Sequence, residues 1–309
     1  MEDIAEDLLP GPVFAVARDR LRRAQASRSR INALWNSMRE HQSFSAWIES
    51  PEPLVRELWC SFNPSLALQR EADDAMADFL RDIKAALDAC VLGAANAVCR
   101  PIGLVEPELH QMPLFDAASD FDSLPAQGQL PGLRPDQIRA LRLLQPFTER
   151  LQAKSTRTIA RDMAHLAAGL EALSSWETSR GERPLFTAWA SEADPKPALP
   201  EGVRVEKTEV DPAGSLSQPK RLARFTLDKG SATASFAGDP NVSFDVILNA
   251  GPWPDDPDDN FSHRSHGLVV ITRHLIEGLE RSVGGHFRVD LLRALDRNRL
   301  IPIEGVVGV

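Results

Sequence analysis

Acidic and histidine side chains gather in one short stretch of the sequence. Asp256 and Asp258 are followed closely by His263 and His266. Carboxylate and imidazole groups together can bind a divalent cation and lower the pKa of a water bound to it. The alternative is a solvated acidic loop ahead of a helix, where negative charge is favoured. We favour the loop, because the glycine and the bidentate glutamate of a calcium-binding loop are missing, and we expect neither a metal nor another cofactor.

A lysine and an aspartate one helical turn apart form a second candidate. Lys84 and Asp88 lie in a segment whose apolar spacing predicts a helix. If the pair is exposed, it stabilises that helix by only a few tenths of a kcal/mol. If it is buried, it either fixes the packing of the helix or is the remnant of a site. We favour the structural interpretation, and the same spacing places Cys90 on the apolar side as a packed, protonated thiol.

Several sequence signatures of catalysis are absent. The chain has no phosphate-binding G-x-x-x-x-G-K, no dinucleotide-binding G-x-G-x-x-G, no hydrolase G-x-S-x-G and no zinc-binding H-E-x-x-H. Nucleotide-dependent and ordinary hydrolytic enzymes therefore lose support. A site assembled from residues that are distant in the sequence stays open, so the sequence leaves enzymatic activity undecided.

The overall charge limits the partners of the chain. Its 309 residues carry a net charge of −9 at pH 7. Binding to nucleic acids and to anionic membranes relies on attraction to phosphate, so this charge argues against both. No apolar run approaches the length of a membrane span. The three cysteines form no C-x-x-C pair and the first residues show no signal pattern, so we expect a cytoplasmic protein with reduced thiols.

Apolar residues at helical spacing predict four long helices. The clearest lies over 65–98, where apolar side chains recur every three or four residues. A helix over 13–40 carries a basic side, although Arg20 and Arg28 fall among its apolar residues. Prolines and glycines interrupt 101–133, which we expect to be a long loop with short turns. The other long helices are expected over 155–176 and 266–283, with a short helix at Pro135.

Alternating apolar residues predict β-strands in two parts of the chain. The segment 44–62 is expected to form a hairpin, with Trp35, Trp47 and Trp59 favoured as core around it over a stacking platform. Prolines break regular structure over much of 180–220. Farther along, strands that should form an antiparallel meander are expected over 203–210, 222–227, 232–236 and 242–248.

Together these elements predict an α+β fold, a helical bundle with a small antiparallel β-meander. A helical region is expected over 1–180, with the short hairpin near 44–62 inside it. A second region over 181–309 should contain the meander, at about 203–250. The helices after the meander are expected to pack back on the bundle.

Three segments carry a family resemblance. Residues 82–90 read D-I-K-A-A-L-D-A-C within the clearest predicted helix. Residues 144–147 read L-Q-P-F, and residues 177–180 read E-T-S-R. In this layout the chain resembles a family of uncharacterised actinobacterial proteins whose corresponding segments read N-L-R-S-A-L-D-H-L, Q-P-Y and D-K-H-R.

The resemblance implies a fold more than an activity. Lys84 and Asp88 take the places of the family's Arg and Asp, whereas Ala89 stands where the family has His. A polar site that used this His is therefore not expected here, and the family has no activity to carry over. Its helical region is similar to HEPN domains, which are helical bundles often found in RNases of toxin and defence systems.

Arg281 and His286 have the spacing of the Arg and His of HEPN nucleases, which lie four to six residues apart. Such short matches arise by chance, and Gly284-Gly285 interrupts the helix between the two residues. We therefore favour a non-enzymatic interaction or regulatory protein that binds a protein partner or a second copy of itself. The alternative is a divergent HEPN-like RNase or toxin- or defence-associated protein, and only this alternative predicts binding to nucleic acid.

Overall fold

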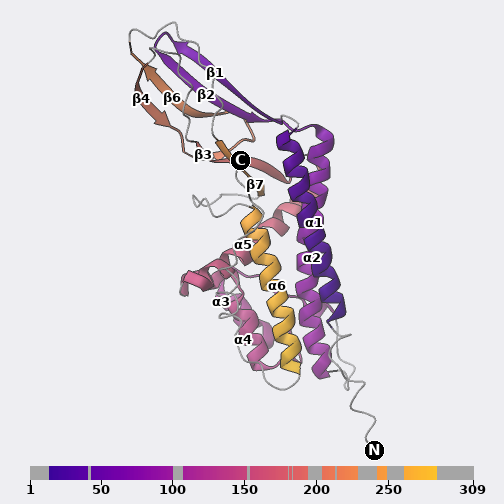
Figure 1. Cartoon of the computed structure of the whole chain (residues 1–309). Helices are drawn as coiled ribbons and strands as arrows, with labels where there is room; N and C mark the ends of the chain where they lie inside the picture. Colours follow the sequence, from indigo (N-terminus) through magenta and orange to yellow (C-terminus); the bar gives the residue numbers. More distant parts are fainter. Residues whose placement is uncertain are drawn as a thin grey trace, which may run out of the picture. The chain divides into compact units, whose positions relative to one another are not determined.

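The computed structural model combines helices with antiparallel strands, which confirms the predicted α+β class (Figure 1). Within the residues that it describes, no helix has both the length and the apolar character needed to cross a membrane. The described residues are 14–40, 43–99, 107–151, 154–179, 181–182, 184–193, 204–212, 214–228, 242–248 and 261–283.

Long helices form where the apolar spacing predicted them. α1 spans Ala15–Glu40, α2 spans Leu66–Cys99 and α5 spans Lys154–Thr178. α6 spans Phe261–Val283, so it begins earlier than the predicted start at residue 266. Phe261, its first residue, is buried. The segment predicted as a loop with turns holds short helices, and α4 begins at Pro135 as expected. The short elements are η2 (Pro107–His110), α3 (Ala118–Ser123), η3 (Leu124–Gln127), α4 (Pro135–Leu143) and η4 (Pro146–Leu151).

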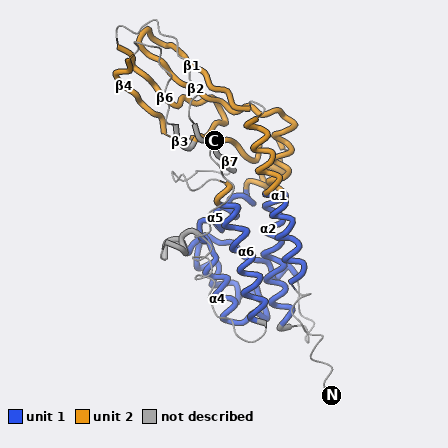
Figure 2. Tube along the Cα trace, viewed as in Figure 1, with its two compact units in different colours: residues 1–28, 78–171, 264–309 blue, residues 29–77, 172–263 orange. Residues whose placement is uncertain are grey.

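The chain groups into two units, each built from separate stretches (Figure 2). Unit 1 comprises residues 1–28, 78–171 and 264–309, and unit 2 comprises residues 29–77 and 172–263. This grouping differs from the predicted division near residue 180, because α1, α2, α5 and α6 each contribute residues to both units. The predicted hairpin and the later strands consequently belong to the same unit.

Unit 1 is a helical bundle with an apolar core. Burying a Leu, Ile, Phe or Met side chain contributes about 1.5–3 kcal/mol, so this core is the main source of its stability. Its buried side chains recur at the spacing of one helix face. They include Leu21 and Ala24 of α1, Phe79, Ile83 and Leu87 of α2, Met163 and Leu166 of α5, and Leu268, Ile271 and Leu275 of α6.

The two arginines among the apolar residues of α1 bind neighbouring helices. Arg20 donates to Asp82 Oδ1 of α2 at 3.0 Å. Arg28 donates from Nε to Ser265 Oγ of α6 at 3.0 Å, and burial lowers the pKa of its guanidinium. Such side chains can keep an aliphatic stem among apolar residues while the charged head reaches a partner. The exceptions to the helical pattern are therefore contacts that orient α1.

The described strands of unit 2 form two antiparallel sheets. The predicted hairpin is confirmed, and its register pairs Phe44 with Phe62 and Ile48 with Leu58. Two later strands extend it, so that the four-stranded sheet has the order β1-β2-β6-β4. Its strands are β1 (Phe44–Glu52), β2 (Val55–Phe62), β6 (Lys220–Leu227) and β4 (Val205–Val210).

The second sheet corrects the predicted meander. Its order is β5-β3-β7, so the strand over 242–248 pairs with β3 and lies in a different sheet from β4 and β6, whereas the predicted meander placed these strands in one sheet. β3 was not predicted, because prolines flank it, yet Phe186, Ala188 and Ala190 are buried along it. The strand predicted over 232–236 lies outside the described residues. The strands are β3 (Phe186–Ala193), β5 (Gly214–Ser215) and β7 (Val242–Leu248).

An aromatic cluster forms part of the core of unit 2. Phe44 stacks on Phe244 of β7 with ring centroids 4.2 Å apart, and its centroid lies 4.9 Å from that of Phe62. Trp35 of α1, which is partly exposed, packs edge-on against Phe44 at 5.5 Å. Aromatic pairs of this kind contribute about 0.5–1.5 kcal/mol beyond their buried area. Because side chains alternate along a strand, the odd-numbered residues of β1 and β2 lie on the opposite face.

Candidate functional site

Lys84 and Asp88 meet on α2, as their spacing predicted. Lys84 Nζ lies 2.5 Å from Asp88 Oδ1, which also accepts the backbone N–H of Met112 at 2.7 Å. His110, on the same segment as Met112, is buried, and its Nε2 lies 2.8 Å from the carbonyl oxygen of Pro131. The Asp88 carboxylate thus attaches the segment that contains η2 to α2, and His110 ties the same segment to the loop at Pro131.

We expect Asp88→Ala to lower the free energy of unfolding by about 1–2 kcal/mol, because the part-buried N–H of Met112 loses its acceptor. Lys84→Ala removes only a partly exposed ion pair and should cost less than about 0.5 kcal/mol. Urea unfolding followed by circular dichroism measures both changes. Equal losses for the two variants would contradict the assignment of Asp88 as the anchor of this segment.

Arg281 lies in the last turn of α6, and its side chain is exposed. Its Nε donates to the carbonyl oxygen of Glu277 at 3.0 Å, and its Nη2 lies 3.6 Å from the carboxylate of the same residue. His286 lies outside the described residues, so the Arg281–His286 pair stays a prediction.

The predicted metal ligands divide between described and undescribed residues. His263 and His266 lie in the first turns of α6 and are exposed, whereas Asp256 and Asp258 lie outside the described residues. In the part of the chain that the structure describes, no group of three or more His, Cys, Asp or Glu side chains is placed to hold a metal ion. α6 by itself therefore contributes at most two ligands to such a site.

A buried ion pair joins α5 to α6 and was not predicted. Arg264 Nη1 donates to Asp162 Oδ1 at 3.0 Å, and both side chains are only 4% exposed. His165 lies about one turn farther along α5, where burial and the nearby charge of Arg264 lower its pKa to about 4. A Cβ atom built on Gly267 would lie 2.0 Å from Asp162 Oδ2, so only glycine fits there without a shift of the carboxylate.

The chemistry open to this ion pair is limited. A general base must reach the proton that it removes, and the Asp162 carboxylate is enclosed and bonded to Arg264. With its lowered pKa, the His165 imidazole is neutral at pH 7. The group therefore fixes the packing of α5 against α6. The sequence signal that points to it is Gly267, an isolated glycine in a helical pattern.

One face of the four-stranded sheet carries two tryptophans. Trp47 of β1 pairs directly with Trp59 of β2, and their rings stack with centroids 6.4 Å apart and an interplanar angle of 15°. Trp47 Nε1 donates to Glu49 Oε1 at 2.9 Å. Trp35, Trp47 and Trp59 are all partly exposed, so none of the three is the fully buried core residue that was expected.

A β-bulge brings two arginines to the same face. The register between β2 and β6 shifts at Leu58 and Trp59, so that β6 has one extra residue there. Arg221 and Arg224 are three positions apart and would lie on opposite faces of a regular strand. With the extra residue between them, Arg221 pairs with Trp59, and Arg224 pairs with Glu57 on the same face.

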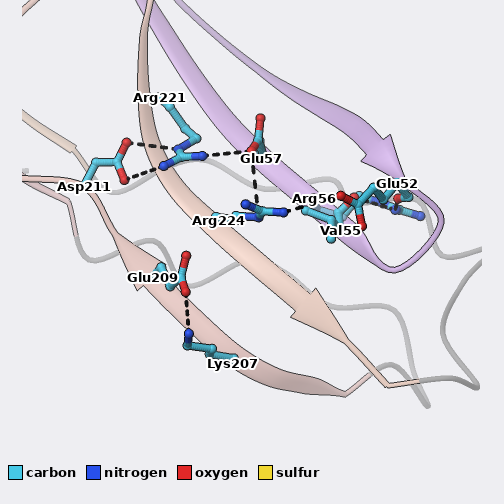
Figure 3. A network of polar contacts seen from close by, with 9 residues as sticks. All are labelled: Glu52, Val55, Arg56, Glu57, Lys207, Glu209, Asp211, Arg221 and Arg224. Carbon is cyan, nitrogen blue, oxygen red and sulfur yellow. Dashed lines mark hydrogen bonds and ion pairs between the residues drawn. The ribbon is translucent and has the colours of Figure 1, made fainter.

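The arginines organise a network of charged side chains (Figure 3). Arg221 donates from Nε and Nη2 to the two carboxylate oxygens of Asp211 at 3.0 and 3.1 Å, and from Nη1 to Glu57 at 2.9 Å. The hydrogen bonds to Asp211 and then Glu57 raise the pKa of Arg221. Arg224 lies 3.9 Å from Glu57 and 3.7 Å from Glu52. The bidentate contact with Asp211 fixes the plane of the Arg221 guanidinium.

Two further charged contacts border this network (Figure 3). Arg56 is buried, and its Nη1 donates to three carbonyl oxygens of the β1–β2 turn at 2.9–3.4 Å, which closes that turn. On the edge strand β4, Lys207 Nζ lies 2.5 Å from Glu209 Oε1 and lowers the pKa of that carboxyl. The charges of this side of the sheet are thus largely paired with one another.

We define the tryptophan face as the six residues Trp47, Glu49, Glu57, Trp59, Arg221 and Arg224. Trp and Arg are enriched in protein-binding surfaces, where they supply most of the binding energy. Hydrogen bonds and stacking already hold these side chains in place. Both tryptophans were expected to be core, although the period-two pattern of the hairpin places them on one face, and the arginines depend on a bulge that the sequence does not signal. The arrangement suits docking of a protein surface.

No family model, curated protein or solved structure matches the chain. The resemblance to the actinobacterial family thus rests on the three sequence segments alone and stays a proposal. Function is therefore inferred from the geometry of the tryptophan face.

Proposed function

We propose that the protein is a non-enzymatic interaction or regulatory protein that binds another protein through the tryptophan face. The proposal is carried by the stacked, partly exposed Trp47 and Trp59 beside the Arg221–Asp211–Glu57 network. Truncation of Trp and Arg side chains is what most often weakens protein complexes. Because these side chains are already ordered, a partner that docks on them incurs little loss of side-chain entropy.

The charges of the tryptophan face favour a protein over a nucleic acid as the partner. Arg221 and Arg224 contact carboxylates of their own chain, so their charge is largely compensated. Nucleic acids are bound mainly by cations that neutralise phosphates. The net charge of −9 adds a general repulsion. A protein surface with both apolar and charged groups fits this face better.

The proposal includes a reducing, cytoplasmic compartment. Cys60 and Cys90 are free and buried, and burial raises the pKa of the Cys60 thiol to about 11. Such thiols stay protonated and unreactive, as packed core groups do. The RNase alternative has less support, because Arg281, the described member of its pair, contacts its own helix.

Trp47→Ala should weaken the complex with the native partner by at least about tenfold, because a rigid, partly exposed indole at a binding surface is a typical hot spot. The partner is first captured from an extract of the source cells with the full chain and identified. It is then purified, and its dissociation constant is measured by isothermal titration calorimetry against the wild-type chain and the variant.

Leu66→Ala is a matched control, because Leu66 is an exposed apolar residue (66%) on α2 and is not part of the tryptophan face. It should leave the dissociation constant within about twofold of wild type. Equal binding by wild type and Trp47→Ala would refute the proposal. So would degradation of total RNA by the purified chain that Arg281→Ala abolishes, since that result would support the RNase alternative.

A further inference from the structure

β4 forms one edge of the four-stranded sheet. Among the described strands it pairs with β6 alone, through a register in which Glu209 faces Arg224. Its residues from Glu206 to Val210 are exposed, and among the residues that the structure describes Val210 is one of three large apolar side chains with high exposure, at 51%. An edge strand of this kind presents backbone groups that can pair with another strand.

The backbone of β4 is oriented for such pairing at Thr208. Asp211 N donates to Leu222 O of β6 at 2.9 Å, which directs the peptide groups of Asp211 toward β6. In an antiparallel pair, this direction alternates from residue to residue. The N–H and C=O of Thr208 therefore point away from β6, toward the open edge of the sheet.

The charges on β4 are arranged so that the strand can pair with a second copy of itself. Lys207 and Glu209 flank Thr208 and extend from the same side of the sheet, where they contact each other. If two copies of β4 align antiparallel about a two-fold axis at Thr208, each Lys207 faces Glu209 of the second copy. Opposite charges directly across a strand pair favour association, and like charges oppose it.

We infer that β4 is a self-association surface, and that its occupant is β4 of a second copy of this chain. The pairing joins two four-stranded sheets edge to edge, satisfies the outward peptide groups of Thr208 and shields Val210 in part. The other edge strand, β1, is less suited to this role, because it contains Pro51 and an irregular register between Glu49 and Glu52. This edge shares no residue with the tryptophan face, although Glu209 pairs across β6 with Arg224 of that face.

Charge reversal provides the test. By analytical ultracentrifugation of the full chain at physiological salt, the wild type should form dimers in a concentration-dependent manner. Lys207→Glu and Glu209→Lys should each weaken self-association at least about tenfold, because each places like charges opposite one another. An equimolar mixture of the two variants should recover dimers, since the strands then match, and the double variant should also dimerise.

The inference is overturned if the wild type stays monomeric, if the single variants dimerise like wild type, or if mixing them fails to restore dimers. Thermal unfolding checks that the single variants are folded. Thr208→Pro is a second variant that removes an outward N–H without breaking a bond to β6, and a dimer that survives it also contradicts the inference. Trp47→Ala should dimerise like wild type, which separates this surface from the proposed partner site.

Discussion

Gly267→Ala should destabilise the protein by about 3–5 kcal/mol, the cost of separating a buried ion pair. The new Cβ would lie 2.0 Å from Asp162 Oδ2 and 2.7 Å from its Cγ. An exposed carboxylate would move aside at little cost, but this one is enclosed and accepts a hydrogen bond from Arg264. Relief of the clash therefore separates the two charges inside the helical bundle. Urea unfolding monitored by circular dichroism measures the loss.

Asp162→Ala supplies the control for this prediction. It removes the atoms that the new Cβ would meet, although it leaves Arg264 without its carboxylate and is destabilising by itself. In this background Gly267→Ala should be neutral or stabilising by up to about 1 kcal/mol, because alanine favours a helix interior over glycine. Additive effects of the two substitutions would show that Gly267 is not required by the carboxylate.

Elements defined by local spacing were predictable from the sequence. The helices α1, α2 and α5 follow from apolar residues at helical intervals, and the β1–β2 hairpin follows from its alternation and central prolines. The pairing of distant strands was not predictable in the same way. β2 pairs with β6 and β3 with β7 because of core packing in unit 2, such as the stacking of Phe44 on Phe244. No local pattern encodes that choice.

The candidate site shows the same division. The period of two in the hairpin accounts for Trp47 and Trp59 lying on one face, where they pair across its strands, although they were predicted to be core. Arg221 and Arg224 join them only through the bulge in β6, which shifts the register by one residue. Strict alternation assigns these arginines to opposite faces. The network in Figure 3 therefore could not be predicted from the sequence and is visible only in the structure.

Asp73 is expected to make stability depend on pH. It is 3% exposed on α2, where its Oδ1 accepts the N–H of Leu185 at 2.8 Å and lies 3.2 Å from Gln69 Nε2. These contacts hold the start of β3 against α2. Burial nevertheless raises the pKa of this carboxyl from its ordinary 3.8 to about 6, because the hydrogen bonds offset desolvation only in part.

The direction of the pH effect follows from this raised pKa. Between about pH 4 and 6 the folded protein holds more protons at Asp73 than the unfolded chain does. The stability that comes from this protonation is therefore fully present below pH 4 and is lost as the pH rises through 6. Asp73→Asn cannot ionise, yet its side-chain oxygen can still accept the Leu185 N–H. Relative to wild type, this variant should therefore gain about 2 kcal/mol between pH 4 and pH 7.

Urea unfolding of both proteins at intervals from pH 4 to pH 7 measures this difference, in which the titration of all other groups largely cancels. Asp78→Asn alters an exposed carboxylate on the same helix and should change the free energy of unfolding by less than about 0.5 kcal/mol. A difference between Asp73→Asn and wild type that stays constant across the range would contradict the expectation. It would mean that the hydrogen bonds that Asp73 accepts, such as the one from Leu185, fully offset the effect of burial on the pKa of its carboxyl.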